Sequence, residues 1–417
     1  MASQQSLRSS QDARLRGLLK TVVGRNPFQT TRLRQAGLDG PGIDRADFLA
    51  RCPFTTKAEL IADQQAHPPF GSNLTWPVER YVRYCQTSGT NGRPLRWLDT
   101  AEDWSGMQDT WQRLFHAWDV GAVDRIFAAF SFGPFLGFWT AYEAAVRLGC
   151  LCLPGGGLTS RARLEVMHDA GATVLLATPT YVIRLGEAVR TEGIPVPSLR
   201  RIIVGGEPGG SIPATRQRIA ELWPGATLID HHGMTEVGPV SWQDPADPGR
   251  LLLDEERYLV EVVDPAGSQA VAPGGTGELV LTTLGRPGSP LLRYRTGDLV
   301  RLAGDPAVEG YALAGGILGR VDDMVVIRGV NVWPAAVEAV VRRFAEVLEF
   351  RCLLSRERGM AELRLQLEPL AGADAARLCD EVQAALGTAL LLRIPVEPVA
   401  AGALPRPEMK SRRWLNL

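Results

Sequence analysis

Residues 84–94 read Tyr-Cys-Gln-Thr-Ser-Gly-Thr-Asn-Gly-Arg-Pro and follow the end of an apolar, strand-like sequence. The small residues let backbone N–H groups approach an anion, the hydroxyl groups add donors, and Arg93 adds fixed positive charge. The segment therefore predicts a loop that binds a polyphosphate such as that of ATP. It is not a P-loop, because the pattern G-x-x-x-x-G-K-[ST] is absent and Pro94 leads into an extended sequence rather than a helix. Taken alone, the segment also fits an ordinary Gly/Ser/Asn turn.

The composition is that of an ordinary globular protein. The 417 residues are 45% hydrophobic and 22% charged, enough for a large core in two or three lobes. A formal net charge of -1 gives no overall attraction to nucleic acid or to a membrane surface, so the expected partner is a small molecule. No apolar stretch approaches the roughly 20 residues of a membrane span, and the first residues lack an apolar signal core. Six cysteines without C-x-x-C spacing are typical of a reducing compartment, so we expect a cytoplasmic protein.

The middle of the chain has the pattern of a helix-covered parallel sheet. Buried strands are predicted at 125–130, 173–178, 201–205 and 226–230, with helices at 159–170 and 212–222. Ahead of them, helices are predicted around residues 15–22 and after Thr100, the latter with a core-facing aromatic stripe. From Tyr258 onward, paired strands such as 277–283 predict an antiparallel or barrel-like part. The expected fold class is α/β, a large N-terminal domain with parallel sheets plus a barrel-like β part, and the ligand is expected at the strand ends.

The last part of the chain predicts a separate small α+β domain with βαββαβ-like order. Strands are expected at 324–327, 348–354, 363–367 and 393–399, with helices from Pro334 and over 375–386. The junction 315–323 is glycine-rich and charged, which suits a hinge. We therefore expect domains at 1–319 and 320–417, the second one mobile.

Four further polar segments follow the first, each beside apolar strand sequence. They are 205–208, 231–236, 294–298, and 319–323 together with 328–331. In this order, with Lys410 near the end, they resemble the acyl-adenylate-forming (AMP-binding) enzyme superfamily. Within it, the chain resembles the phenylacetate–CoA ligase family in its segments 53–60 (Pro-Phe-Thr-Thr-Lys-Ala-Glu-Leu), 155–159 (Gly-Gly-Gly-Leu-Thr), 178–181 (Thr-Pro-Thr-Tyr) and 328–334 (Arg-Gly-Val-Asn-Val-Trp-Pro). The resemblance spans residues 50–414 and implies the adenylate-forming ligase fold.

The resemblance implies an ATP site with Mg²⁺. Thr235 would contact phosphate, and Glu236 would hold Mg²⁺, a hard cation that prefers oxygen ligands. Asp298 would accept the two ribose hydroxyls, and Arg93 stands where the family usually has lysine. The nucleotide-binding residues implied in this way are Thr87, Ser88, Gly89, Thr90, Gly92, Arg93, Gly206, Glu207, Pro208, His231, His232, Gly233, Asp298 and Arg320.

The same resemblance makes Lys410 the catalytic residue of the first half-reaction, together with Thr235 and Glu236. Lys410 would reach the α-phosphate and the carboxylate as charge builds at phosphorus. Without the family motif, a solvated lysine near the C-terminus is the alternative. Asp322 is the expected hinge residue about which the small domain turns, and a simple turn aspartate is its alternative.

Besides Arg93, the chain departs from the family in two further places. His232 stands where the family commonly has an aromatic residue that stacks on adenine, a task that imidazole performs less well. Some relatives carry a metal site with cysteine and histidine after the glutamate motif, but residues 241–244 read Ser-Trp-Gln-Asp, so that site is expected to be lost. Zinc at His231 and His232 is rejected because no cysteine or third histidine lies nearby.

The carboxylate substrate is expected beside Gly206 and Glu207, in a flat slot that favours an aryl or arylacetic acid over a fatty acid. The predicted pocket residues are Phe132, Gly133, Phe135, Phe138, Tyr181 and Gly206. The aromatic residues among them also fit a core role. Coenzyme A is the default acyl acceptor, and an amine, hydroxyl or carrier-protein thiol in a biosynthetic pathway is the alternative. A catalytically silent adenylate-binding protein is a third reading, and relatives suggest a homodimer.

Overall fold

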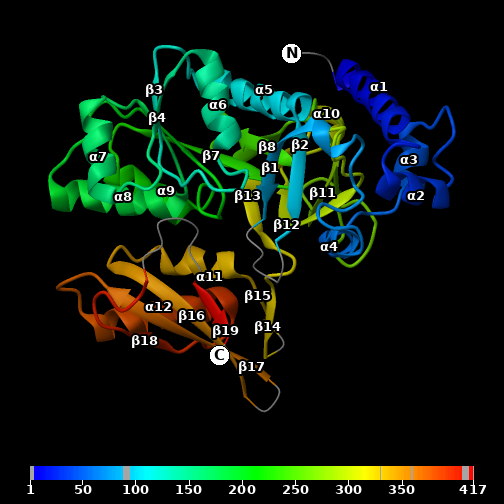
Figure 1. Cartoon of the computed structure of the whole chain (residues 1–417). Coiled ribbons are helices and arrows are strands. Elements are labelled where there is room, and N and C mark those ends of the chain that lie inside the picture. Colours follow the sequence, from blue (N-terminus) through cyan, green and yellow to red (C-terminus); the bar gives the residue numbers. More distant parts are fainter. Residues whose placement is uncertain (1–3, 88–93, 329, 358–359, 406–412, 417) are drawn as a thin grey trace.

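The computed structural model describes residues 4–87, 94–328, 330–357, 360–405 and 413–416. The chain forms a large domain and, beginning near β14 (Val325–Ile327), a smaller one that lies below it in Figure 1. The predicted phosphate loop residues 88–93 and Lys410 lie outside the described residues.

The large domain is built on one 11-stranded sheet in the order β10-β11-β12-β13-β9-β8-β7-β6-β5-β3-β4. Strands β4, β3, β5, β6 and β7 run parallel, and the others continue the sheet in antiparallel pairs. The bounds are β3 Arg125–Ala128, β4 Leu151–Pro154, β5 Val174–Ala177, β6 Arg201–Val204, β7 Thr227–Met234, β8 Gly238–Gln243, β9 Arg250–Leu253, β10 Tyr258–Val263, β11 Thr276–Thr283, β12 Tyr294–Leu302 and β13 Ala312–Arg320. The predicted parallel strands are thus confirmed. The later strands β8 to β13 are antiparallel and continue the same sheet, with β10 at its edge among the described strands, and their side chains gather in one common core, as expected for the barrel-like part.

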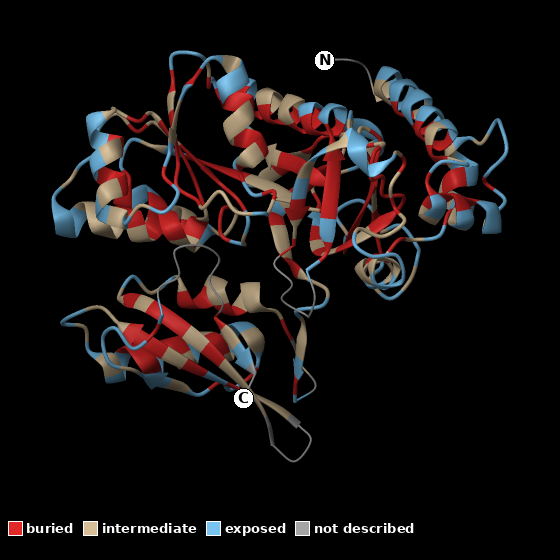
Figure 2. Ribbon diagram, viewed as in Figure 1, coloured by how far each residue is buried: buried red, intermediate tan, exposed pale blue. Residues whose placement is uncertain are grey.

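Helices cover both faces of the parallel strands (Figures 1 and 2). They are α5 Ala101–Ala117, α6 Trp139–Leu148, α7 Ser160–Asp169, α8 Pro179–Glu192 and α9 Pro213–Leu222. Successive strand residues point to opposite faces, so Ile126 and Ile203 pack into the core beneath α5 and α6, whereas Phe127 and Ile202 pack into the core beneath α7, α8 and α9. The predicted helix α5 begins with a capping box between Thr100 and Asp103, and its aromatic stripe is buried, as expected.

The first hundred residues form small helices and one hairpin. The helices are α1 Gln4–Val22, α2 Pro27–Gln35, α3 Arg45–Arg51 and α4 Lys57–Ala66, with a 3₁₀ turn at Val78–Arg80, and a short helix α10 Pro306–Glu309 lies near α1. Only α1 was predicted from its apolar spacing. Strands β1 (Tyr81–Gln86) and β2 (Arg96–Thr100) pair antiparallel and flank the predicted phosphate loop.

The small domain has a four-stranded sheet in the order β18-β17-β16-β19 and a separate β14-β15 hairpin. Its elements after β14 are β15 Val330–Val332, α11 Pro334–Val341, β16 Val347–Glu357, β17 Met360–Pro369, α12 Ala375–Leu390, β18 Val396–Pro398 and β19 Trp414–Asn416. The predicted α+β order is confirmed, with β15 and β19 as additions of three residues each. The core of this domain contains no large-domain residue among those described, which fits a unit that folds around its own interior.

Two general expectations were also tested. None of the described helices is long and apolar enough to cross a membrane. All six cysteines, each within the described residues, are free thiols, and Cys150 and Cys152 donate to backbone carbonyls rather than meeting metal ligands.

Candidate active site

The predicted site segments converge at one edge of the sheet. Parallel strands end at a common edge, and there β3 leads into residues 129–138, β5 into Thr178–Tyr181 and β6 into Gly205–Pro208. The turn between β7 and β8 carries Thr235 and Glu236. The structure therefore brings together segments that lie up to a hundred residues apart in the chain.

Three predicted nucleotide residues meet around the Asp298 carboxylate. His232 Nε2 lies 2.9 Å from Asp298 Oδ2, and Arg320 donates to Asp298 Oδ1 at 3.1 Å. Arg320 also donates to Asp322, the predicted hinge residue, at 2.8 Å. Gly297 has φ +77°, and a Cβ there would lie 2.5 Å from the Arg320 guanidinium, so this position requires glycine. A carboxylate held in this way is a fitting acceptor for two hydroxyl groups.

His232 has one ring nitrogen to spare. Its Nδ1 is buried and has no hydrogen-bond partner among the described residues. Buried polar atoms are normally satisfied, so this nitrogen is consistent with a bound polar group such as a nucleotide base. The predicted stacking role stays a prediction, because the contact that the structure describes is the one to Asp298.

His231 points the other way from His232, as adjacent strand residues must. The centroid of its ring lies 4.2 Å from the ring centroid of Trp111 on α5, and its Nδ1 lies 2.8 Å from the Ser241 carbonyl oxygen. A carbonyl only accepts, so Nδ1 carries the hydrogen. Burial lowers the pKa of His231 to about 3, which keeps the ring neutral. Its role in nucleotide binding stays a prediction.

Glu236 is a buried carboxylate with a cation beside it. Lys57 Nζ, at the start of α4, lies 2.9 Å from Glu236 Oε1, and the Tyr294 hydroxyl donates to the same oxygen at 3.5 Å. Glu236 is only 4% exposed. No cluster of three metal-ligating side chains occurs among the described residues, so a cation here would need oxygens from a bound phosphate as well. Mg²⁺ is commonly held in that way, by one or two carboxylates and phosphate oxygens.

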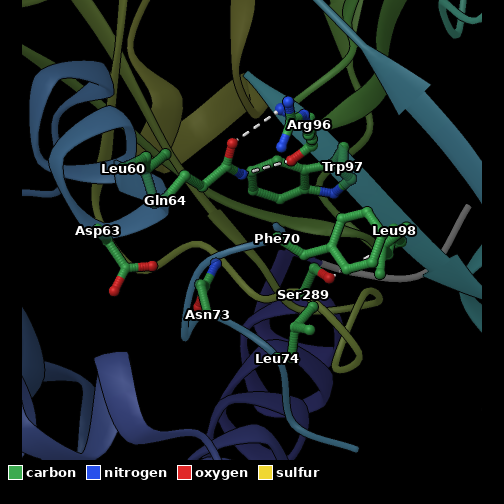
Figure 3. Close-up of a pocket in the computed structure, with 10 residues that line it drawn as sticks. All are labelled: Leu60, Asp63, Gln64, Phe70, Asn73, Leu74, Arg96, Trp97, Leu98 and Ser289. Atoms are coloured by element: carbon green, nitrogen blue, oxygen red, sulfur yellow. Dashed lines mark hydrogen bonds between the residues drawn. The ribbon is translucent and has the colours of Figure 1, made fainter. Parts of the chain in front are cut away.

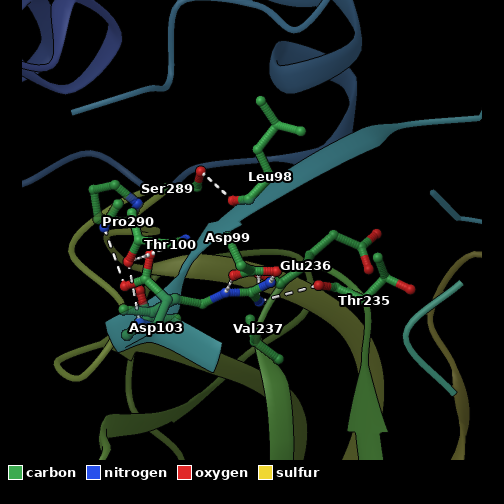
Figure 4. Close-up of polar contacts among 12 residues, drawn as sticks. Leu98, Asp99, Thr100, Asp103, Thr235, Glu236, Val237, Ser289 and Pro290 are labelled. Atoms are coloured by element: carbon green, nitrogen blue, oxygen red, sulfur yellow. Dashed lines mark hydrogen bonds and ion pairs between the residues drawn. The ribbon is translucent and has the colours of Figure 1, made fainter. Parts of the chain in front are cut away.

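Arg286 is a part of the site that the sequence did not reveal, and its partners Asp99, Thr235 and Glu236 are labelled in Figure 4. It is 2% exposed and donates to both oxygens of Asp99 on β2, at 2.5 and 2.8 Å. It also donates to the carbonyls of Thr235 at 3.1 Å and Glu236 at 2.9 Å. Arg286 thereby fixes the hairpin of the phosphate loop to the Thr235–Glu236 turn. Only the long-range fold brings Asp99 and Arg286 together, so no local pattern could have indicated the pair.

Glu207 fixes the Gly206–Glu207–Pro208 segment to helix α8. The backbone N–H of Thr180, in the first turn of α8, donates to Glu207 Oε1 at 2.9 Å. Gly206 has φ +90°, a conformation that favours glycine. The predicted adenine and carboxylate segment is thus attached to Thr178–Tyr181, the other segment expected to line the substrate.

The predicted pocket residues differ in how far they are buried. Phe132 is half-buried among aromatic neighbours, with ring centroids 4.6 Å from Phe130 and Trp139 and 5.2 Å from Tyr142. Phe138 and Tyr181 are buried in packed cores, and the Tyr181 hydroxyl lies 3.1 Å from Ser160 Oγ. Gly133 and Phe135 lie in the same loop, where a Cβ on Gly133 would approach the Phe135 ring to 2.6 Å.

A small cavity lies beside strand β2, and none of the predicted pocket residues lines it (Figure 3). Its volume of about 10 Å³ is room for about one water molecule. Gln64 exchanges two hydrogen bonds with the Arg96 backbone at its rim. This cavity is too small for a nucleotide or a carboxylic acid. Its lining residues are Leu60, Asp63, Gln64, Phe70, Asn73, Leu74, Arg96, Trp97, Leu98 and Ser289.

Asp230 is an acid buried behind the site, and it yields a prediction about pH. Burial raises its pKa to about 6, although a short hydrogen bond from Ser211 and the charge of Arg216 oppose the shift. A raised pKa means that the stabilising contribution is complete below the unfolded value of 3.8 and is lost as the pH rises through about 6. Asp230→Asn cannot ionise, so between pH 4 and 7 the stability of the variant should rise relative to that of the wild type by about 2 kcal/mol. Thermal unfolding midpoints of both proteins across this range test it, and parallel pH profiles would contradict it.

Comparisons with known proteins identify the family of the chain. The AMP-binding enzyme family matches residues 53–285, and the AMP-binding enzyme C-terminal domain matches residues 329–417. A phenylacetate-coenzyme A ligase of Thermus thermophilus is 34% identical over 87% of this chain and 82% of its own length.

Solved structures of 2-hydroxyisobutyryl-CoA ligase resemble the whole chain. In the postadenylation state, that enzyme is 28% identical and superposes with a TM-score of 0.90 over 100% of this chain and 90% of its own. In the thioesterification state, at 29% identity and the same coverage, the TM-score is 0.73. The relative placement of the two domains here is thus close to that of the postadenylation state. The chain belongs to the AMP-binding enzyme family, as a phenylacetate-CoA ligase-like, adenylate-forming acid–CoA ligase.

Proposed function

We propose that this enzyme activates an aryl or arylacetic acid with ATP and Mg²⁺, releases pyrophosphate, and transfers the acyl group from the adenylate to coenzyme A. Relatives of this chain are named phenylacetate-coenzyme A ligase. Their name supports an arylacetic acid as the substrate and coenzyme A as the acyl acceptor. The structures of 2-hydroxyisobutyryl-CoA ligase hold an acyl-adenylate and coenzyme A, which supports the same two ligands here.

The loop after β3 is the observation that best supports an aromatic substrate. Phe132 presents a partly buried ring within an aromatic cluster, and its neighbour Gly133 accepts a hydrogen bond from Trp139 Nε1 at 3.1 Å. The Gln86 N–H, at the end of β1, donates to the Pro134 carbonyl at 2.5 Å. The aromatic loop therefore adjoins the hairpin of the phosphate loop, which suits an aromatic carboxylate whose carboxyl end meets ATP.

The chain's own residues supply binding and electrostatics in this proposal. A substrate carboxylate oxygen attacks the α-phosphorus of ATP, and the bond to the pyrophosphate oxygen breaks. Glu236 would hold Mg²⁺, which would screen the phosphate charges. Asp298 would accept from the ribose hydroxyls in place of its present contacts to His232 and Arg320. Thr87, the described end of the phosphate loop, is held by the N–H of Leu95 donating to its hydroxyl at 3.0 Å. Lys410 would stabilise the charge at phosphorus.

The test is carboxylate-dependent pyrophosphate release across benzoic, hydroxybenzoic, aminobenzoic, arylacetic, fatty and 2-hydroxyisobutyric acids, with and without coenzyme A. We expect the strongest release with an aryl or arylacetic acid and formation of its thioester. A preference for 2-hydroxyisobutyrate or a fatty acid would refute the aromatic proposal. Release without a thioester that is accelerated by an amine, hydroxyl or carrier protein would identify the other acceptor. No release with any acid would favour the catalytically silent protein.

A further inference from the structure

Arg413 is anchored in the small domain by its side chain and its backbone. The side chain is 8% exposed, donates to Glu349 at 2.8 Å and to Glu338 at 2.9 Å, and lies 5.1 Å from the Phe350 ring centroid. Its carbonyl accepts from the Cys352 N–H at 2.6 Å, at the start of the β16–β19 pairing. A buried arginine with two carboxylates and a ring face has a fixed guanidinium plane.

The same guanidinium reaches across to the large domain. Arg413 Nη2 donates to Thr180 Oγ1 at 3.5 Å, over a sequence separation of 233 residues. Burial lowers the pKa of Arg413, but Glu338, Glu349 and Glu207 raise it, and the net direction is up. Glu207 is the residue that Thr180 holds by its backbone N–H. Arg413 therefore acts on the junction that joins helix α8 to the predicted adenine and carboxylate segment.

This contact depends on the placement of the two domains. Thr180 and Glu207 belong to the large domain, whereas Glu338 and Glu349 belong to the small one, so a rotation of the small domain would separate the two sets. The placement here matches the postadenylation state of 2-hydroxyisobutyryl-CoA ligase far better than the thioesterification state. The hydrogen bond from Arg413 to Thr180 is thus specific to one arrangement of the domains.

We propose that Arg413 is a positioning residue for the first half-reaction: by joining Glu338 and Glu349 of the small domain to Thr180 of the large domain, it holds the small domain in the placement seen here, on which acyl-adenylate formation depends. This inference rests on the two-step reaction proposed above but not on which acid is the substrate. The alternative is an ion pair that only stabilises the small domain.

The central experiment measures the two half-reactions separately in Arg413→Lys and Thr180→Val. Lysine keeps the charge among the glutamates but cannot reproduce the arginine fork, and valine removes only the acceptor hydroxyl while keeping the N–H that holds Glu207. We expect carboxylate-dependent exchange of pyrophosphate into ATP to fall about 100-fold in Arg413→Lys and several-fold in Thr180→Val, because small misplacements are costly. Thioester formation from supplied acyl-adenylate and coenzyme A should stay within about twofold. Arg377→Lys, an exposed arginine of α12 paired with Glu346, is the matched control and should change neither rate.

Two further outcomes decide between the readings. In the double variant the Thr180→Val effect should vanish, because its partner is already gone. Equal slowing of both half-reactions by Arg413→Lys, or unchanged exchange, would overturn the proposal. Small-angle X-ray scattering of the free proteins needs no substrate: the wild type should fit the present structure and Arg413→Lys should not. Matching curves would also overturn the proposal, even if no acid proves active, so its failure can be told from failure of the proposed function.

Discussion

Lys410→Ala is expected to slow acyl-adenylate formation by about 100- to 1,000-fold, the loss typical when one preorganised donor to a developing negative charge is removed. The resemblance places Lys410 at the α-phosphate and at the attacking carboxylate, where a cation matters only as charge builds. The family assignment makes this the residue with the largest expected effect on the first half-reaction. Single-turnover pyrophosphate release, with the acid that the panel identifies, measures it.

Three controls separate this role from binding and from folding. ATP affinity, measured by calorimetry, should change little, because Asp298, Glu236 and the phosphate loop remain. Thioester formation from supplied acyl-adenylate should persist, since the lysine serves only the first step. Lys410→Arg keeps the charge but changes its shape, so it should retain part of the rate. An unchanged rate in Lys410→Ala would leave the lysine as a solvated residue near the C-terminus.

The parts of the fold that follow local rules were predictable from the sequence. Apolar runs of five or six residues predicted the parallel strands β3, β5, β6 and β7 but not β4, and the Thr100–Asp103 capping box predicted the start of α5. Helices α2 to α4 were missed because they are short and lie among Gly and Pro residues that punctuate the pattern. Strands β15 and β19 have three residues each, too few for a clear local pattern. Strand β15 pairs with its neighbour β14 in a tight hairpin, whereas β19 exists through long-range pairing with β16.

The candidate site divides along the same line. Asp298, Glu236 and Arg320 stand in motifs, so their types and spacing could be read from the chain. Arg286 and Arg413 lie outside those motifs. Arg286 pairs with Asp99, 187 residues away, and Arg413 contacts Thr180, 233 residues away, so only the fold reveals their importance. His232 is a third case. Its place in the site was expected, but its hydrogen bond to Asp298 depends on how the fold brings β7 and β12 together in space.

Arg286→Met is expected to destabilise the large domain by about 3–5 kcal/mol, because it leaves the Asp99 carboxylate buried without its main partner. Asp99 is 0% exposed, so solvent cannot take the place of the guanidinium. The midpoint of thermal unfolding measures the loss. Arg113→Met, at a more exposed arginine that pairs with Asp254 and Glu256, is a milder comparison.

The double variant Arg286→Met, Asp99→Leu separates stability from site geometry. Replacing both members of a buried ion pair by apolar groups is often close to neutral, so most of the unfolding midpoint should return. ATP affinity should not return with it, because the carbonyls of Thr235 and Glu236 would still lack the donor that ties their turn to the hairpin of the phosphate loop. Recovery of both properties would show that Arg286 serves only to neutralise Asp99. Recovery of stability alone would identify the buried pair as the link between the phosphate loop and the predicted magnesium residue.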